Sequence, residues 1–349
     1  MSSWRSWLNK TNPSLLDRAA QIPLSLASLG YAIAIRLRNQ LYDLGWKKSF
    51  KASVPVISVG NLSVGGTGKS PTVAWLAKWF RAHDVRVAIL SRGYGQLDDG
   101  RNDEALELEL KLPDVPHLQN PDRVASSQLA TDELEMQVLV LDDGFQHRRL
   151  VRDLDIVLID ATDSKVAARL LPAGLRREPL RAIRRAHFVI ITRANAVAES
   201  ELSLLNSRIQ KFISSNRIAT ATHQPQSLLQ HPNNQKPLDS LRGKQVLAFC
   251  GIGNPTAFFE SLKAQGAVLL DQRSWPDHHA YTAEDIQSLI DWHNDDRDAV
   301  LLCTVKDWVK IQESSLGGRD LLALEIELKF LSGQGELESL LESCIQFDE

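Results

Sequence analysis

The chain has 349 residues, of which 43% are hydrophobic and 24% are charged, and its formal net charge is -3. This composition is that of an ordinary globular protein and excludes a disordered or fibrous chain, while the length predicts two domains. The acidic overall charge also argues against general nucleic-acid binding, so no nucleic-acid partner is expected.

The amino-terminal segment, residues 1–52, is basic, with eight Lys and Arg residues against two Asp. Its most apolar run is IPLSLASLGYAIAI, residues 22–35. As a helix this run is about 21 Å long, which is too short for the roughly 30 Å hydrocarbon core of a bilayer. Two interpretations stay open: a helix packed on the protein core, or a helix in the membrane interface, with five aromatic side chains near the lipid headgroups, namely Trp4, Trp7, Tyr31, Tyr42 and Trp46.

A phosphate-binding loop is predicted directly after a short apolar strand at residues 54–59. The following glycines let the backbone curl with its N–H groups inward, and a helix beginning near Ser70 directs its positive end at an anion. Lys69 can then reach the phosphates of ATP, and the Ser70 hydroxyl can ligate Mg²⁺. Serine stands at the first glycine position of the usual pattern, and the predicted loop consists of Ser63, Val64, Gly65, Gly66, Thr67, Gly68, Lys69 and Ser70.

Two acids end the apolar run VLVLDD, residues 138–143. In a parallel sheet, Asp142 and Asp143 would lie at the carboxyl end of a buried strand, beside the phosphate loop, where such sheets bind ligands. A carboxylate there commonly holds Mg²⁺ directly or through water. Gln146 and His147 follow as candidate substrate contacts, although a structural role for His147 stays open.

Further strands at residues 155–160 and 187–192 predict an α/β fold like that of P-loop nucleotide hydrolases, with a doubly wound parallel sheet. Arg92, after a strand at 85–90, is a candidate phosphate contact. In a later loop, Arg177 could bind a phosphate and Glu178 could hold that arginine in position. For Arg92, Arg177 and Glu178 alike, the alternative is an ordinary surface charge.

After a polar stretch at residues 196–243, strand and helix patterns resume and predict a second, smaller α/β domain. His278 and His279 follow an acid there, but no third ligand is spaced to complete a metal site, so contact with substrate or catalysis at a cleft is favoured. Cys250 and Cys303 lie in apolar strands and are expected to be buried. The predicted divisions are a membrane-associated segment at 1–52, a P-loop domain at 53–215, and a domain at 216–349 that closes over the cleft.

The chain resembles the tetraacyldisaccharide 4'-kinase family of lipid A biosynthesis in seven blocks, which occur in one order between about residue 14 and residue 311. The blocks are ISVGNLSVGGTGKSP, SRGYG, LDDGFQHRRLVRDLDIVLID, LLPAGLRREPL, FCGIGNP, PDHHAYT and TVKD. The resemblance implies transfer of the ATP γ-phosphate to the 4'-hydroxyl of a tetraacylated glucosamine disaccharide 1-phosphate, which yields lipid IVA. It also implies a peripheral, monotopic enzyme on the cytoplasmic face of a bacterial inner membrane.

The same resemblance implies roles for residues outside the phosphate loop. Asp103 would take the proton of the sugar hydroxyl, with His278 as its partner and His279 as the less favoured choice. Here the sequence departs from the family, because Asn102 and Ala105 replace the glycine and proline of its Gly-Asp-Glu-Pro motif and the preceding hairpin is shortened. Two rival functions remain: a nucleotide hydrolase of the P-loop type, and a noncatalytic membrane scaffold that binds ATP.

Overall fold

The computed structural model describes residues 15–93, 102–163, 169–232, 234–292 and 298–345, with side chains from Gln21 onward. The chain divides into two compact units. The described residues of the smaller unit come from Tyr94–Lys111 and Gln224–Glu327, and those of the larger unit come from Ser3–Gly93, Leu112–His223 and Leu328–Glu349. Strands β7 (Ile218–Gln230) and β13 (Arg319–Ser332) contribute residues to both units.

The larger unit is built on parallel strands that follow one another in the order β7-β6-β5-β1-β4-β2-β3. Their pairings are parallel, which agrees with the predicted parallel sheet. The central strands are buried over their whole length, as expected for a sheet covered on both faces. Their bounds are β1 Val56–Asn61, β2 Val87–Ser91, β3 His117–Gln119, β4 Val138–Asp142, β5 Leu154–Asp160 and β6 Phe188–Thr192.

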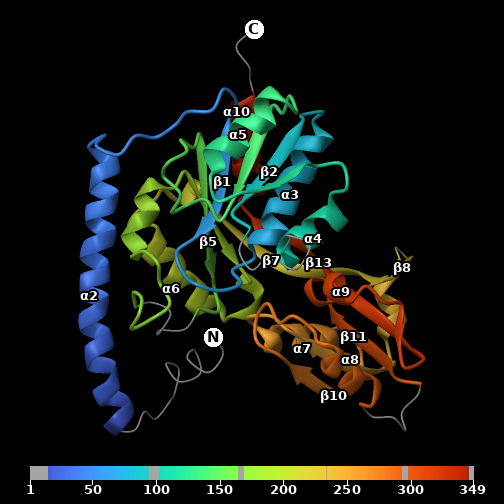
Figure 1. Cartoon of the computed structure of the whole chain (residues 1–349). Coiled ribbons are helices and arrows are strands. Elements are labelled where there is room, and N and C mark those ends of the chain that lie inside the picture. The colour runs from blue at the N-terminus through green and yellow to red at the C-terminus, as the bar shows by residue number, and fades with distance from the viewer. Residues whose placement is uncertain (1–14, 94–101, 164–168, 233, 293–297, 346–349) are drawn as a thin grey trace. The chain divides into compact units, whose positions relative to one another are not determined.

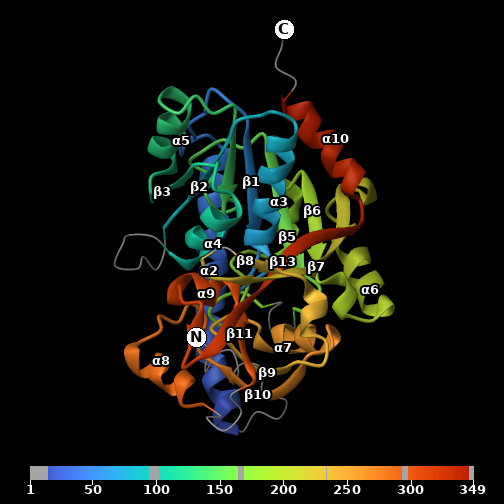
Figure 2. The same cartoon turned by 90° about the vertical axis from the view of Figure 1, so that its right-hand side faces the viewer.

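Helices cover this sheet because alternate strand residues point to opposite faces. One core cluster joins Val157 and Val189 to α6, and another joins Ala88 and Leu139 to α5. Helix α3 contacts β1, β2 and β4, and Figure 2 shows it along these strands. The helices of the unit are α2 Leu15–Asp43, α3 Lys69–Ala82, α5 Arg123–Asp132, α6 Glu199–Ile209 and α10 Gln334–Ile345, with 3₁₀ turns at Leu180–Arg185, Ala194–Ala196 and Ser215–Arg217.

Helix α2 is one long helix that extends beyond the predicted apolar run at both ends (Figure 1). Several of its large apolar side chains are exposed, and they recur at helical spacing on one side of the helix: Ile22, Leu26, Leu29, Ile33 and Leu37. Among the described residues, no helix combines the length and the apolar character needed to cross a bilayer.

The smaller unit contains parallel strands in the order β10-β9-β11-β13, with β12 antiparallel to β13 and β8 antiparallel to β7. The apolar run at residues 299–311 divides into β11 and α9. The polar stretch at 196–243, for which no elements were predicted, contains α6, β7 and β8. The remaining bounds are α4 Asp103–Lys111, β8 Asn234–Lys236, a 3₁₀ turn at Leu238–Leu241, β9 Gln245–Cys250, α7 Pro255–Ala264, β10 Val268–Ser274, α8 Ala283–Ile290, β11 Val300–Thr304, α9 Val305–Ile311 and β12 Ser315–Leu316.

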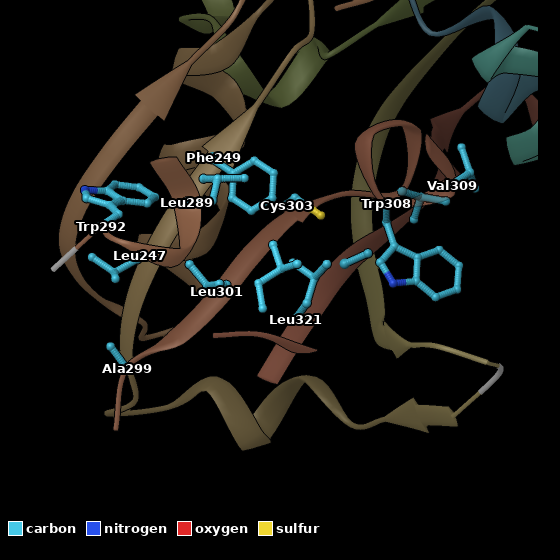
Figure 3. Close-up of a cluster of buried hydrophobic side chains, with 13 residues drawn as sticks. Leu247, Phe249, Leu289, Trp292, Ala299, Leu301, Cys303, Trp308, Val309 and Leu321 are labelled. Carbon is cyan, nitrogen blue, oxygen red and sulfur yellow. The ribbon is translucent and has the colours of Figure 1, made fainter. Parts of the chain in front are cut away.

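Two cores lie on opposite faces of these strands. Phe249 and Leu301 belong to the cluster of α8 and α9 that Figure 3 shows, together with Trp308. Their chain neighbours Ala248 and Leu302 belong instead to a second cluster under α7. The alternation of neighbouring residues between the two clusters fixes the register of the strands, because a shift by one residue would exchange the faces. Cys250 and Cys303 are buried free cysteines, as predicted.

Candidate functional site

The predicted phosphate loop lies in the larger unit between β1 and α3. Gly65 and Gly68 adopt φ values of 136° and 89°, which favour glycine over residues with a Cβ. At Gly68 an added Cβ would lie 2.3 Å from Nε2 of His223, so the histidine ring would have to move to admit it. The loop thus brings its backbone to the N-terminus of α3, which begins at Lys69. This arrangement is typical of an anion-binding site.

Side chains from neighbouring strands hold this loop in shape. Asn61 at the end of β1 donates to Thr67 Oγ1 at 2.9 Å, and Thr192 at the end of β6 donates to the Thr67 carbonyl at 2.9 Å. Arg193 donates to the Gly66 carbonyl at 2.9 Å and forms an ion pair with Asp160. The loop is therefore fixed by groups at the ends of β1 and β6, and Asp160 at the end of β5 anchors Arg193 in turn.

Lys69 and Arg177 both face the carboxylate of Asp143. Lys69 Nζ lies 3.6 Å from Asp143 Oδ1, and Arg177 Nη1 donates to Asp143 Oδ2 at 2.7 Å. Burial alone would raise the pKa of Asp143, but the charges of Lys69 and Arg177 lower it. Asp143 is therefore an ionised carboxylate at neutral pH, held between two cations at the phosphate loop.

Asp142 ends β4 and is buried, and its backbone carbonyl accepts from Arg123 at 2.9 Å. Ser70 is also buried, in the first turn of α3. One hydroxyl and one carboxylate beside a phosphate loop are a donor set that suits Mg²⁺, which usually keeps waters and phosphate oxygens as its other ligands. No group of three or more His, Cys, Asp or Glu side chains in the described part of the chain could hold a metal ion without such help.

Glu178 is a fully buried carboxylate that organises the loop beside Arg177. It forms an ion pair with Arg185 at 3.0 Å and accepts from Gln146 Nε2 at 3.2 Å. The same Gln146 nitrogen donates to the carbonyl of Asn61 at 2.9 Å. The predicted substrate contacts Gln146 and Glu178 thus lie together, and both are engaged in holding the site.

His147 is half-buried beside a group of arginines. Its burial and the nearby charges of Arg123, Arg152 and Arg149 lower its pKa to about 4. The ring is therefore neutral at physiological pH. Arg92 directly follows β2 and its side chain is exposed.

Asp103 and His278 come together in the smaller unit, although 174 residues separate them in the chain. Asp103 is the first residue of α4, and Asn102 before it accepts the N–H of Ala105 at 2.8 Å. His278 Nδ1 lies 2.9 Å from Asp103 Oδ1. Burial would raise the pKa of Asp103, but the His278 hydrogen bond and the charges of Lys306, His278 and Lys310 lower it to about 2.

Two lysines of α9 complete this acidic and basic group. Lys310 Nζ lies 3.7 Å from Asp103 Oδ2 and 3.4 Å from Asp307 Oδ1, and Lys306 pairs with Glu104 at 2.9 Å. His279 turns instead to Asp285, with Nε2 2.9 Å from Oδ2. Of the two adjacent histidines, His278 is thus the one that contacts Asp103.

Sequence reasoning missed several residues of these groups. Asn61 and Arg193 support the phosphate loop, His223 lies against Gly68, and Lys306 and Lys310 adjoin the Asp103 group. The block TVKD could have indicated Lys306, because a lysine inside an apolar segment needs a carboxylate partner. The supporting side chains of the loop had no such signal.

Comparison with known proteins identifies relatives along nearly the whole chain. The family model for tetraacyldisaccharide-1-P 4'-kinase matches residues 20–346. A tetraacyldisaccharide 4'-kinase from Desulfatibacillum aliphaticivorans is 36% identical over 352 residues, with 93% of each chain covered, and one from Pelobacter propionicus is 40% identical over 298 residues, with 80% of each covered. The crystal structure of LpxK from Aquifex aeolicus in complex with ATP superposes with a TM-score of 0.75 at 33% identity, covering 94% of this chain and 99% of that one.

Proposed function

Because this chain belongs to the tetraacyldisaccharide 4'-kinase family, we propose that it transfers the γ-phosphate of ATP to the 4'-hydroxyl of a tetraacylated glucosamine disaccharide 1-phosphate. The product would be lipid IVA, an intermediate of lipid A biosynthesis. The observation that carries the proposal is the glycine loop before α3, which offers Lys69 and backbone N–H groups to a triphosphate next to Asp142 and Asp143. The ATP complex of the Aquifex aeolicus relative supports ATP as the phosphate donor.

Phosphoryl transfer needs positioning and charge neutralisation more than covalent chemistry from the protein. Lys69 binds oxygens of the β- and γ-phosphates, and Arg177 adds a second positive charge at Asp143. Ser70 and Asp142 would hold Mg²⁺, which would supply positive charge to neutralise the phosphates. Asp143 already pairs with two cations, and we propose that it would assist Asp142 in holding the metal.

The acceptor hydroxyl must lose a proton as its oxygen bonds to the γ-phosphorus and the bond to the bridging oxygen of ADP breaks. Asp103 is ionised at neutral pH and receives this proton, and His278 at 2.9 Å shares and stabilises it. His279, bound to Asp285, is left as a substrate contact, as are Arg92, Gln146 and His147. We also propose, as the sequence predicts, that the domain at 216–349 closes over the active site.

The proposed substrate carries four acyl chains that stay in a bilayer, so the enzyme must work at a membrane surface. The exposed apolar side chains of α2, 56–68% accessible, suit the acyl region of one leaflet. Trp46 is 77% exposed just beyond the helix, next to the exposed Lys47 and Lys48, where lipid headgroups would lie. We therefore place the protein as a peripheral enzyme on the cytoplasmic face of the inner membrane. Trp4 and Trp7 lie outside the described residues.

Incubation with γ-labelled ATP and the tetraacyldisaccharide 1-phosphate tests the proposal. The expected result is label in the lipid. Release of labelled inorganic phosphate without lipid labelling would instead identify a nucleotide hydrolase. ATP binding without either product would favour the noncatalytic scaffold.

A further inference from the structure

Helix α2 has a polar side that is hydrogen-bonded to the phosphate-site loops of its own unit. Ser28 Oγ accepts the N–H of Ala173 at 2.9 Å, and the Tyr31 hydroxyl donates to the carbonyl of Arg177 at 3.1 Å. Five residues before the end of α2, Arg38 donates to the carbonyl of Gln146 at 2.7 Å. This side differs from the exposed apolar side, so α2 is held to the catalytic loops along much of its length.

Asn39 makes the contact that reaches furthest into the site. Its Nδ2 atom donates to Oε2 of Glu178 at 2.9 Å. Glu178 is fully buried, and a buried carboxylate depends on its hydrogen-bond donors because water cannot replace them. Its other donors are Arg185 and Gln146. A residue of α2 therefore supplies part of the support for this carboxylate.

The contacts continue from Glu178 to the phosphate loop. Gln146 bridges Glu178 and the carbonyl of Asn61, the residue that holds Thr67. Arg177, the chain neighbour of Glu178, donates to Asp143, which faces Lys69 at 3.6 Å. Each step is a direct polar contact or a peptide bond. A shift of Glu178 would therefore move the side chains that bear on the triphosphate.

We infer that Asn39 is a positioning residue of the ATP site, acting through Glu178 on Gln146 and Arg177. Helix α2 then has two functions on two sides: its apolar side contacts lipid, and its polar side helps to shape the site that binds the nucleotide. The inference rests on the proposed role of the Lys69 loop in binding ATP. It predicts that ATP affinity depends on a helix that does not contain the phosphate loop.

The test compares Asn39→Ala with Gln40→Ala, its exposed neighbour on α2, in the full chain in detergent micelles. ATP affinity is measured by calorimetry, together with KM for ATP, kcat, the melting temperature and binding to lipid vesicles. Asn39→Ala is expected to weaken ATP binding about tenfold, the scale of one hydrogen bond to a charged group, and to raise KM more than it lowers kcat. Gln40→Ala should match the wild type, and neither variant should change vesicle binding.

A second variant keeps the inference testable if Asn39→Ala is unstable. Asn39→Asp keeps the shape but places a second carboxylate against Glu178, so ATP binding relative to wild type should be weak at pH 8 and should recover toward pH 5.5 as the pair takes up a proton. The charged or titratable groups facing this pair are Arg185, Arg177, Arg38, Arg148 and Tyr31. A merely structural defect would not show this pH-dependent recovery.

A double-mutant cycle with Glu178→Gln gives the decisive comparison. If Asn39 acts through Glu178, the effects of Asn39→Ala and Glu178→Gln on ATP affinity are not additive. Additive effects, or an Asn39→Ala protein that binds ATP as tightly as wild type, would overturn the inference. A wild-type chain that does not bind ATP would instead reject the proposed function.

Discussion

The imidazole of His278 faces the carboxylate of Asp103 almost symmetrically, with Nδ1 2.9 Å from Oδ1 and 3.0 Å from Oδ2. Asp103 is nearly buried, whereas about half of the His278 side chain is exposed. A proton taken up by the carboxylate can therefore pass to a ring that is in contact with solvent. The hydrogen bond to Asp103 also raises the pKa of His278, which favours the protonated ring.

Replacing Asp103 by Asn should lower kcat by about 10² to 10⁴, the usual contribution of general-base catalysis. ATP affinity should stay close to that of wild type, because Asp103 does not belong to the phosphate loop. Steady-state kinetics and calorimetry on the same preparation check both points. Glu109→Gln, an exchange on the same helix, serves as the control. An unchanged kcat would transfer the base function to another acid.

The Asp103–His278 contact should make stability depend on pH in a defined direction. The pKa of Asp103 falls from 3.8 to about 2 on folding, so the ionised form stabilises the folded state above pH 3.8 and the stabilisation is lost as the pH falls through about 2. The shift corresponds to about 2 kcal/mol. Urea unfolding between pH 5 and pH 2 should show this loss in wild type and a smaller one in Asp103→Asn. If the free energy of unfolding fell equally with pH in the two proteins, the lowered pKa of Asp103 would be contradicted.

Lys69→Ala should abolish turnover and weaken ATP binding strongly, because the variant loses the cation that we propose binds the phosphates. The fold should persist, since the partner of the Lys69 side chain among the described residues is Asp143, which lies at the site itself. Lys78→Ala on the exposed side of the same helix is the matched control. Activity assays and circular dichroism check the pair. Near-normal turnover in Lys69→Ala would reject the phosphate-loop assignment.

Two charges placed on the apolar side of α2 should detach the protein from membranes. The double variant Leu26→Glu, Ile33→Glu replaces two of the exposed apolar side chains with carboxylates. A carboxylate is unfavourable in the acyl region of a bilayer. The ratio of vesicle-bound to free protein in a flotation assay should fall about tenfold or more, while ATP affinity in detergent stays unchanged. Ala27→Glu combined with Ala34→Glu adds the same charge at exposed positions beside the apolar stripe. Equal flotation of the two double variants would argue against the proposed orientation.

The phosphate loop and the central strands could be predicted because their signals are local. Glycines with positive φ, the adjoining Lys69, and fully apolar runs such as that of β4 each require no distant partner. The twin acids at the end of β4 could be placed because parallel strands end at one edge of a sheet.

The rest depends on contacts between distant segments. Helix α6 and strand β7 are partly exposed and polar, so their periodicity is weak. Neither composition nor spacing pairs Asp103 with His278, and only the family resemblance brought them together. Asn39 and Arg193 look like ordinary surface residues in the sequence, and their importance follows from the buried acceptors they meet.

Strand β11 passes directly into α9, with Thr304 ending the strand and Val305 beginning the helix. There is no loop to absorb a change in length, so deleting one residue of β11 would turn α9 by about 100° as well as exchange the two cores. Lys310 would then leave Asp103, and Asp307 would leave the Gly251 N–H that it accepts. We therefore expect chain-length variation near Asp103 to be confined to the segments on either side of the β11–α9 junction.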